Sequence, residues 1–295
     1  MAASGKGKKS SSWLVVIIWV IVAFLCFQGY LLFSRQNRLP LISVVQQPQR
    51  PPVLKPPVKP AKPLKPLPAG VTGRIAVILD DWGYNRNHCK YLSEFDAPVT
   101  PAIMPDLPYS RDVLRCAMEA GQDAMLHLPM EPYVVREKYP QGYMLTTAMP
   151  QREVQRLLNK VLNEFKGIVG VNNHEGSRGT ESPELMTTVM AELKNRGLFF
   201  VDSLTSAKSV CSPVAARIGV LFARRNIFLD NRNDRAAIEH QFELAAKIAK
   251  EKGFVVIIGH DRVLTMQILT EQIRKLKSQG YVFMRVKDFI QARRP

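Results

Sequence analysis

The chain has 295 residues and a formal net charge of +16 at pH 7, a length that allows one large domain or two small ones. Residues 1–70 contain ten lysines and arginines and no acidic residue, which leaves a net charge of only +6 for residues 71–295. Because the basic excess lies mostly in the N-terminal region, and the remainder shows no arginine-rich helix, zinc-finger spacing or basic-aromatic repeat, we expect no nucleic-acid partner.

The N-terminal region predicts a single membrane anchor. Residues 13–33, WLVVIIWVIVAFLCFQGYLLF, carry no charge and follow a short segment that contains Lys6, Lys8 and Lys9. As a helix rising about 1.5 Å per residue, they would extend roughly 31 Å, which matches a bilayer core of about 30 Å. No small-residue cleavage site follows, which favours an uncleaved signal-anchor over a signal peptide. We take residues 1–12 as cytoplasmic, and we expect the chain after the anchor to lie in the periplasm or outside the cell.

Residues 34–70 predict an extended linker. Ten prolines lie between residues 40 and 70, a density that neither a helix nor a central strand tolerates. A polyproline-type spacer rising about 3.1 Å per residue would reach on the order of 90 Å. This predicts a tether that holds a domain away from the membrane, with an untuned disordered linker as the alternative. The folded domain is then residues 71–295.

The domain alternates between strand-like and helix-like patterns. Periodic apolar residues predict helices around 154–165 and 238–249, and a third helix begins with Ser182 as N-cap and Pro183, and ends before Gly197. Short apolar runs predict strands at 75–79, 98–104, 124–128, 168–171, 198–201, 227–229, 254–258 and 281–284. Such alternation predicts an α/β fold with a parallel sheet. Seven or eight units in about 225 residues favour a barrel over an open doubly wound sheet.

Polar residues follow the predicted strands where parallel α/β folds carry their chemistry. They are Asp80 and Asp81, His127 and Glu131, Asn172 to Glu175 with Ser177 and Arg178, Asp202 with Ser203 and Thr205, Asn231 and Asn233, and His260 with Asp261. Two adjacent carboxylates repel each other, and such a pair usually needs a cation or a proton between them.

Three of the five histidines, His127, His174 and His260, end apolar strands, whereas His88 and His240 lie in polar or helical contexts and are expected at the surface. Three such histidines with two aspartates on one predicted face indicate a functional site. One carboxylate and two imidazoles form a common open site for a divalent metal, most often zinc. The second carboxylate could accept a proton from water, and a further histidine could donate one to a leaving group.

Other chemistries fit less well. Neither Ser203 nor Ser177 lies in a G-x-S-x-G motif, and the excess of histidines argues against a two-carboxylate glycosidase. No strand is followed by a dinucleotide or P-loop fingerprint. Three cysteines, Cys89, Cys116 and Cys211, lie in the domain, so one disulfide is possible in an oxidising compartment, with the pairing left open.

Six segments resemble, in chain order, the strand-end motifs of the divergent polysaccharide deacetylase family, which is related to the metal-dependent deacetylases of carbohydrate esterase family 4. They are AVILDDWGY, LHLPMEP, GVNNHEGSRGT, FVDSLTS, IFLDN and VVIIGHDR, and the resemblance covers about residues 73–290. It implies a distorted (β/α) barrel of about seven strands.

The resemblance also implies roles for individual residues. It implies Asp81, His127 and His174 as ligands of a divalent metal, Asp80 as catalytic base and His260 as general acid. Asp202, together with Arg178, would orient His260 and Asp80.

Two positions depart from the family pattern. Where the main family has His-x-x-x-His, this chain has His127 and Glu131, so the second imidazole has to come from His174. Glu175 stands after the NNH histidine, where the divergent branch has an apolar residue. Either glutamate is expected to enter the metal shell or to pair with an arginine.

These observations predict a membrane-anchored hydrolase, exported from the cytoplasm, that removes acetyl groups from a cell-envelope polysaccharide with a divalent metal. The alternative is an envelope scaffold that binds a glycan or an envelope protein partner with the same barrel and does not turn it over.

Overall fold

The structure is a computed structural model that describes residues 27–28, 67–134 and 141–291. The chain divides into two units, Met1–Pro56 and Pro57–Pro295, and the fold described below is that of the second unit. The predicted anchor at 13–33 and most of the linker at 34–70 lie outside the described residues, so both stay predictions. Among the residues that are described, no helix combines the length and the apolar character needed to cross a membrane.

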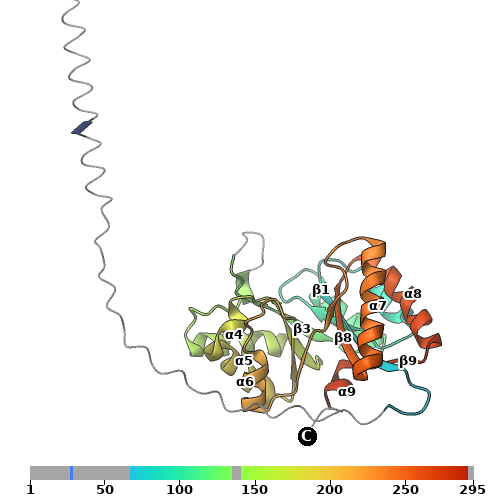
Figure 1. The fold of residues 1–295 in the computed structure, drawn as a ribbon. Helices are drawn as coiled ribbons and strands as arrows, with labels where there is room; N and C mark the ends of the chain where they lie inside the picture. Colours follow the sequence, from blue (N-terminus) through green and yellow to red (C-terminus); the bar gives the residue numbers. More distant parts are fainter. Residues whose placement is uncertain (1–26, 29–66, 135–140, 292–295) are drawn as a thin grey trace, which may run out of the picture. The chain divides into compact units, whose positions relative to one another are not determined.

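Eight parallel strands form one sheet in the order β6-β5-β4-β3-β2-β1-β8-β7, which curves into a half-barrel (Figure 1). Their bounds are β1 Gly73–Trp82, β2 Thr100–Ile103, β3 Met125–Met130, β4 Gly170–Glu175, β5 Phe199–Asp202, β6 Phe222–Arg224, β7 Ile227–Phe228 and β8 Phe254–His260. A ninth strand, β9 Tyr281–Phe283, pairs with the first three residues of β1. Each predicted strand overlaps an observed one, and the fold is the expected distorted β/α barrel.

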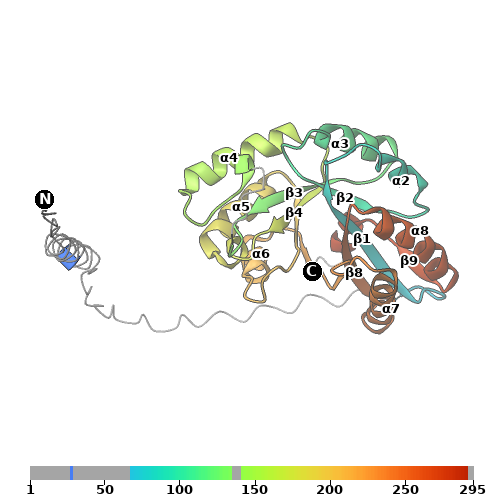
Figure 2. The same ribbon diagram turned by 90° about the horizontal axis from the view of Figure 1, so that it is seen from above.

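The helices follow the strands, and all except α9 lie on the outer side of the sheet (Figure 2). They are α2 Cys89–Glu94, α3 Ser110–Glu119, α4 Gln151–Glu164, α5 Pro183–Asn195, α6 Cys211–Ile218, α7 Arg235–Lys252, α8 Val263–Ser278 and α9 Val286–Gln291, with short 3₁₀ helices at Gln141–Tyr143 and Gly179–Glu181. Helix α5 begins as predicted: the Ser182 hydroxyl accepts a hydrogen bond from the Leu185 amide, and Pro183 is the first helical residue.

The distortion of the barrel lies between β6 and β7. These edge strands are joined only by Arg225 and Asn226, so the chain itself bridges the two edges of the sheet. The Arg225 amide donates to Asp202 O of β5 at 2.9 Å, and the Asn226 amide donates to Val256 O of β8 at 2.8 Å. β6 was not predicted, although its first two residues, Phe222 and Ala223, end the apolar run at 218–223.

Alternate residues of each strand face two separate apolar layers. In β1, Ile75, Val77 and Leu79 pack against the helices, whereas Ala76 and Ile78 face the inside of the barrel. This is the period-two pattern expected of a strand that is buried on both faces. Polar residues replace the inner apolar ones only near the carboxyl ends of the strands, which places the site there.

Helix α9 fills the opposite end of the barrel. Its residues Val286, Phe289 and Ile290 are buried in the inner layer, and the rings of Phe289 and Phe254 lie 5.0 Å apart. The barrel interior is therefore a packed core at this end, and the cavity opens at the other.

We expect Phe289→Ala to lower the free energy of unfolding by about 3–5 kcal/mol, because it removes a buried ring and leaves a cavity. Lys287→Ala, at an exposed position of the same helix, should change it by less than about 0.5 kcal/mol. Urea denaturation followed by circular dichroism measures both, and equal effects would contradict the packing of α9 inside the barrel.

Candidate metal centre

A bulge at the end of β1 directs two successive carboxylates into one cavity. In a regular strand Asp80 and Asp81 would point to opposite faces of the sheet. The register with β2 shifts between Leu79 and Trp82, and Asp81 has a φ of 66°, a left-handed conformation that costs energy for a residue other than glycine. As a result both aspartates line the cavity, while Trp82 is fully buried with the outer-layer residues.

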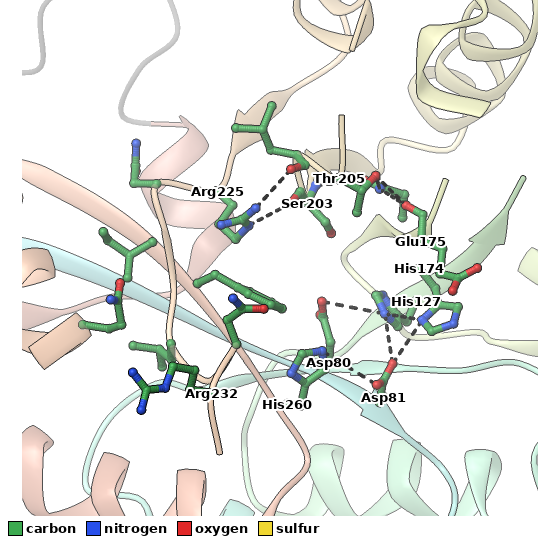
Figure 3. A pocket seen from close by; sticks show the side chains of 18 of the residues that line it. Asp80, Asp81, His127, His174, Glu175, Ser203, Thr205, Arg225, Arg232 and His260 are labelled. Carbon is green, nitrogen blue, oxygen red and sulfur yellow. Dashed lines mark hydrogen bonds and ion pairs between the residues drawn. The ribbon is translucent and has the colours of Figure 1, made fainter. Parts of the chain in front are cut away.

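Three elements bring Asp81, His127 and His174 together (Figure 3). Asp81 Oδ1 lies 3.1 Å from His174 Nδ1 and 3.3 Å from His127 Nε2. The two ring nitrogens lie 3.1 Å apart. Ligands about 2.0–2.1 Å from a tetrahedral metal ion are separated by about 3.3 Å, so the triangle has the size that such an ion requires.

The chemistry of these three groups also fits a divalent cation. Burial raises the pKa of Asp81, but the hydrogen bonds and charges of His127 and His174 outweigh it and hold that pKa well below its usual range. A ligand carboxylate has to be ionised to bind a metal, and this one is. We conclude that Asp81, His127 and His174 could hold a divalent metal ion.

Asn172 connects the metal triad to Asp80. The His127 Nδ1–H group donates to Asn172 Oδ1 at 2.8 Å, so Nε2 is the ring nitrogen that faces Asp81 and His174. Burial lowers the pKa of His127, but the charge of Asp80 and the hydrogen bond and charge of Asp81 outweigh it and raise that pKa to about 9, so Nε2 would have to release its proton to bind a metal ion. The Asn172 amide group donates to Asp80 Oδ1 at 2.7 Å. Such outer-shell hydrogen bonds fix the tautomer and the orientation of a ligand histidine. Asn172 is fully buried and is the residue of β4 opposite His127.

Asp80 is the buried carboxylate of the pair. Its side chain is only 4% exposed, and its Oδ2 lies 3.7 Å from His127 Nε2. Burial raises its pKa above the ordinary value, against the lowering effect of His127, and the charge of Asp81 raises it further. A carboxylate with a raised pKa, beside the metal triad and outside it, is suited to accept a proton.

His260 faces the triad from the end of β8 and is held by Asp230. Its Nδ1–H group donates to Asp230 Oδ1 at 2.8 Å, and its backbone amide donates to Asp230 Oδ2 at 2.9 Å. Its Nε2 lies 3.8 Å from Asp81 Oδ2. Burial lowers the pKa of His260, but the hydrogen bond and the charge of Asp230 prevail and raise it above the ordinary value.

The structure differs from the sequence analysis on the residues expected to orient His260 and Asp80. Asp202 instead accepts hydrogen bonds from the Leu204 amide at 2.8 Å and from the Ser209 hydroxyl at 2.7 Å. Arg178 has a largely exposed side chain and pairs with Glu131 at 3.5 Å. The residues that contact His260 and Asp80 are Asp230 and Asn172, respectively.

The two glutamates that depart from the family pattern, Glu131 and Glu175, lie in different surroundings. Glu131 lies outside the triad, because it pairs with Arg178 and accepts hydrogen bonds from the amide and the hydroxyl of Thr147 at 2.7 and 2.6 Å. Glu175 lines the cavity and has a φ of 50°. Its backbone carbonyl accepts a hydrogen bond from the Asn173 side chain at 2.7 Å.

His88 was expected at the surface, but its side chain is only 16% exposed and its Nδ1 contacts Asp261 Oδ1. The reason is that the Asp261 amide donates to Asp80 O, which brings the loop after β8 over the start of α2.

The cysteine pairing that the sequence left open is between Cys89, next to His88, and Cys116, and Cys211 is a buried free thiol. His240 lies at the surface as predicted, with a side chain 62% exposed.

The sequence matches the family model of the divergent polysaccharide deacetylases over residues 77–290. The chain therefore belongs to that family, as the strand-end motifs predicted.

Two relatives of known sequence are similar over most of the domain. An uncharacterized protein of Haemophilus influenzae is 35% identical over 203 residues, which are 69% of this chain and 72% of that protein. The uncharacterized protein YibQ of Escherichia coli is 30% identical over 207 residues, and the match covers 70% of this chain but only 64% of YibQ.

A solved structure shares the fold. The crystal structure of the uncharacterized protein ATU2773 from Agrobacterium tumefaciens matches with a TM-score of 0.71 at 19% identity, over 77% of this chain and 92% of the other. At this identity the similarity supports the barrel architecture and nothing about the chemistry.

We expect the protein to bind one equivalent of a divalent cation, and His174→Ala to weaken that binding by at least about 100-fold, since loss of a ligand costs more than loss of an outer-shell partner. His240→Ala, at the exposed histidine of α7, should leave the affinity unchanged. Titration calorimetry with divalent cations measures all three proteins. Equal affinity in the two variants would show that the triad does not hold the ion.

Proposed function

We propose that this protein is a membrane-anchored, zinc-dependent hydrolase that removes acetyl groups from a polysaccharide of the cell envelope. The observation that supports this most strongly is the triangle of Asp81, His127 and His174. The Asp80 carboxylate and the hydrogen-bonded pair of His260 and Asp230 lie beside it. Membership in the divergent polysaccharide deacetylase family supports a glycan as substrate.

Each residue at the site has a task in such a reaction. A bound divalent ion supplies an acidified water and a polarised acetyl carbonyl. Asp80, held by the Asn172 amide, accepts the proton of the attacking water. His260, held by Asp230, donates a proton to the departing amine or alcohol.

The choice of zinc follows from the donors. Two imidazoles and one carboxylate, with the other positions left open, are typical of catalytic zinc. Magnesium and calcium prefer shells made of oxygen atoms.

The location of the domain outside the cytoplasm is part of the proposal. Residues 13–33 are apolar enough to anchor the chain, and the prolines that follow suit a tether. The disulfide between Cys89 and Cys116 supports an oxidising compartment. A labelled cysteine scan of residues 34–70 in intact cells would test the orientation.

We expect Asp80→Asn to lower the rate of acetate release by about 10²–10⁴-fold, because an amide cannot accept the proton. Zinc binding should persist, since Asp80 lies outside the metal triad. Acetate release from acetylated cell-wall and exopolysaccharide fragments is the assay, with Asp288→Asn, an exposed aspartate on α9, as the matched control. Full activity in Asp80→Asn would remove the proposed base.

We expect a bell-shaped dependence of kcat/KM on pH. Asp80 acts ionised, so activity falls as the pH drops through its pKa, which burial raises above the ordinary value of about 3.9. His260 acts protonated, so activity falls as the pH rises through its pKa, which Asp230 raises above about 6.5. Asp230→Asn should move the basic limb to lower pH. An unmoved basic limb in that variant would exclude His260 as the acid.

A further inference from the structure

The cavity at the carboxyl ends of the strands has a volume of about 840 Å³ and two ends of unlike charge. The carboxylates that line it, those of Asp80, Asp81 and Glu175, all lie at the end that holds the metal triad (Figure 3). The opposite end is lined by Arg225 and Arg232. The volume is near the upper limit of ligand pockets, roughly 300–1,000 Å³, so there is room beyond a single acetylated sugar.

Arg225 is held rigidly at this second end. Its Nε–H group donates to Ser203 O at 2.7 Å, and its Nη2 group donates to Leu204 O at 3.1 Å. Its guanidinium carbon lies 4.8 Å from the centre of the Phe228 ring. Because Arg225 belongs to the two-residue bridge between β6 and β7, its backbone is fixed as well. The guanidinium is therefore pre-organised, with the Nη1 donors left over.

No carboxylate pairs with Arg225 or Arg232 among the residues described in 67–134 and 141–291, although other arginines of the domain do form ion pairs. Arg285, for example, pairs with Asp123 at 2.7 Å, and Arg235 with Glu271 at 2.8 Å. Arg225 is partly buried, which lowers the pKa of its guanidinium, and the negative charges of Asp80 and Asp202 offset this effect only in part. A partly buried cation without an ion-pair partner is costly. An anionic group of a ligand would compensate it, and the fork of arginine donors suits a carboxylate.

We propose that the arm of the cavity at Arg225 and Arg232 binds a carboxylate-bearing sugar next to the acetylated sugar at the metal end. This rests on the proposed function and narrows it, because the substrate then becomes an acidic glycan in which acetylated and carboxylated residues adjoin. Asn226, Asn231 and Gln241 also line the cavity and offer amide groups for sugar hydroxyls.

Binding measured without turnover tests the inference separately from catalysis. The full-length protein carrying Asp80→Asn is titrated with a hyaluronan tetrasaccharide, in which N-acetylglucosamine and glucuronate alternate, and with the same tetrasaccharide after reduction of its carboxyl groups. Charge-assisted hydrogen bonds predict at least about tenfold tighter binding of the acidic form. If the wild-type protein released acetate from no glycan, the proposed function would be ruled out, but a measured preference for the acidic tetrasaccharide would still stand.

Substitutions of single arginines test whether Arg225 and Arg232 cause the preference for the acidic tetrasaccharide. Arg225→Gln and, independently, Arg232→Gln should each lower the preference for the acidic tetrasaccharide by several-fold or more. Arg232 is exposed and has no hydrogen bond to another described residue, so its replacement should leave folding intact even if that of Arg225 does not. Arg224→Gln, at the exposed neighbour that does not line the cavity, should keep the full preference.

Three results would overturn the inference. The first is equal affinity of the Asp80→Asn protein for the two tetrasaccharides, or no measurable binding of either. The second is an unchanged preference for the acidic tetrasaccharide in both Arg225→Gln and Arg232→Gln. The third, from a titration with inorganic phosphate, is tighter binding of phosphate than of the acidic tetrasaccharide.

Discussion

The site depends on the bulge that ends β1. Without the shift of register after Leu79 and the positive φ of Asp81, one aspartate would face the barrel and the other would face the helices. An unpaired carboxylate among the outer apolar residues would be far more costly than the strained backbone. The same bulge brings Trp82 into the outer core, where its burial helps to hold the strained conformation. The two adjacent carboxylates can then have different roles in one cavity.

Two buried hydrogen-bond pairs make the roles of the acids and histidines different. Asn172 links His127 to Asp80, so the proposed ligand histidine and the proposed base are oriented by one amide. Asp230 holds His260 through both its ring and its backbone amide. Both partners are fully buried and lie on strands or directly after them. The barrel therefore positions the proposed reacting groups from its strands, while the loops shape the cavity around them.

Much of this arrangement could be predicted from the sequence. The alternation of apolar runs and helical periodicity gave the barrel, because strand and helix periods are local properties of the chain. His127, His174 and the two aspartates were found because each ends an apolar run, and parallel strands end at one edge of a sheet. The orienting residues could not be found in this way. Asp230 and Asp202 each lie directly after an apolar run of the sequence, and only the pairing of β7 with β8 shows which one reaches His260.

The most direct test of the metal centre is X-ray absorption spectroscopy of the zinc-loaded protein. We expect a first shell of nitrogen and oxygen atoms at about 2.0–2.2 Å, with the multiple-scattering pattern of two imidazoles. A shell that contains sulfur, or one with no imidazole contribution, would contradict the assignment of Asp81, His127 and His174 as the metal ligands.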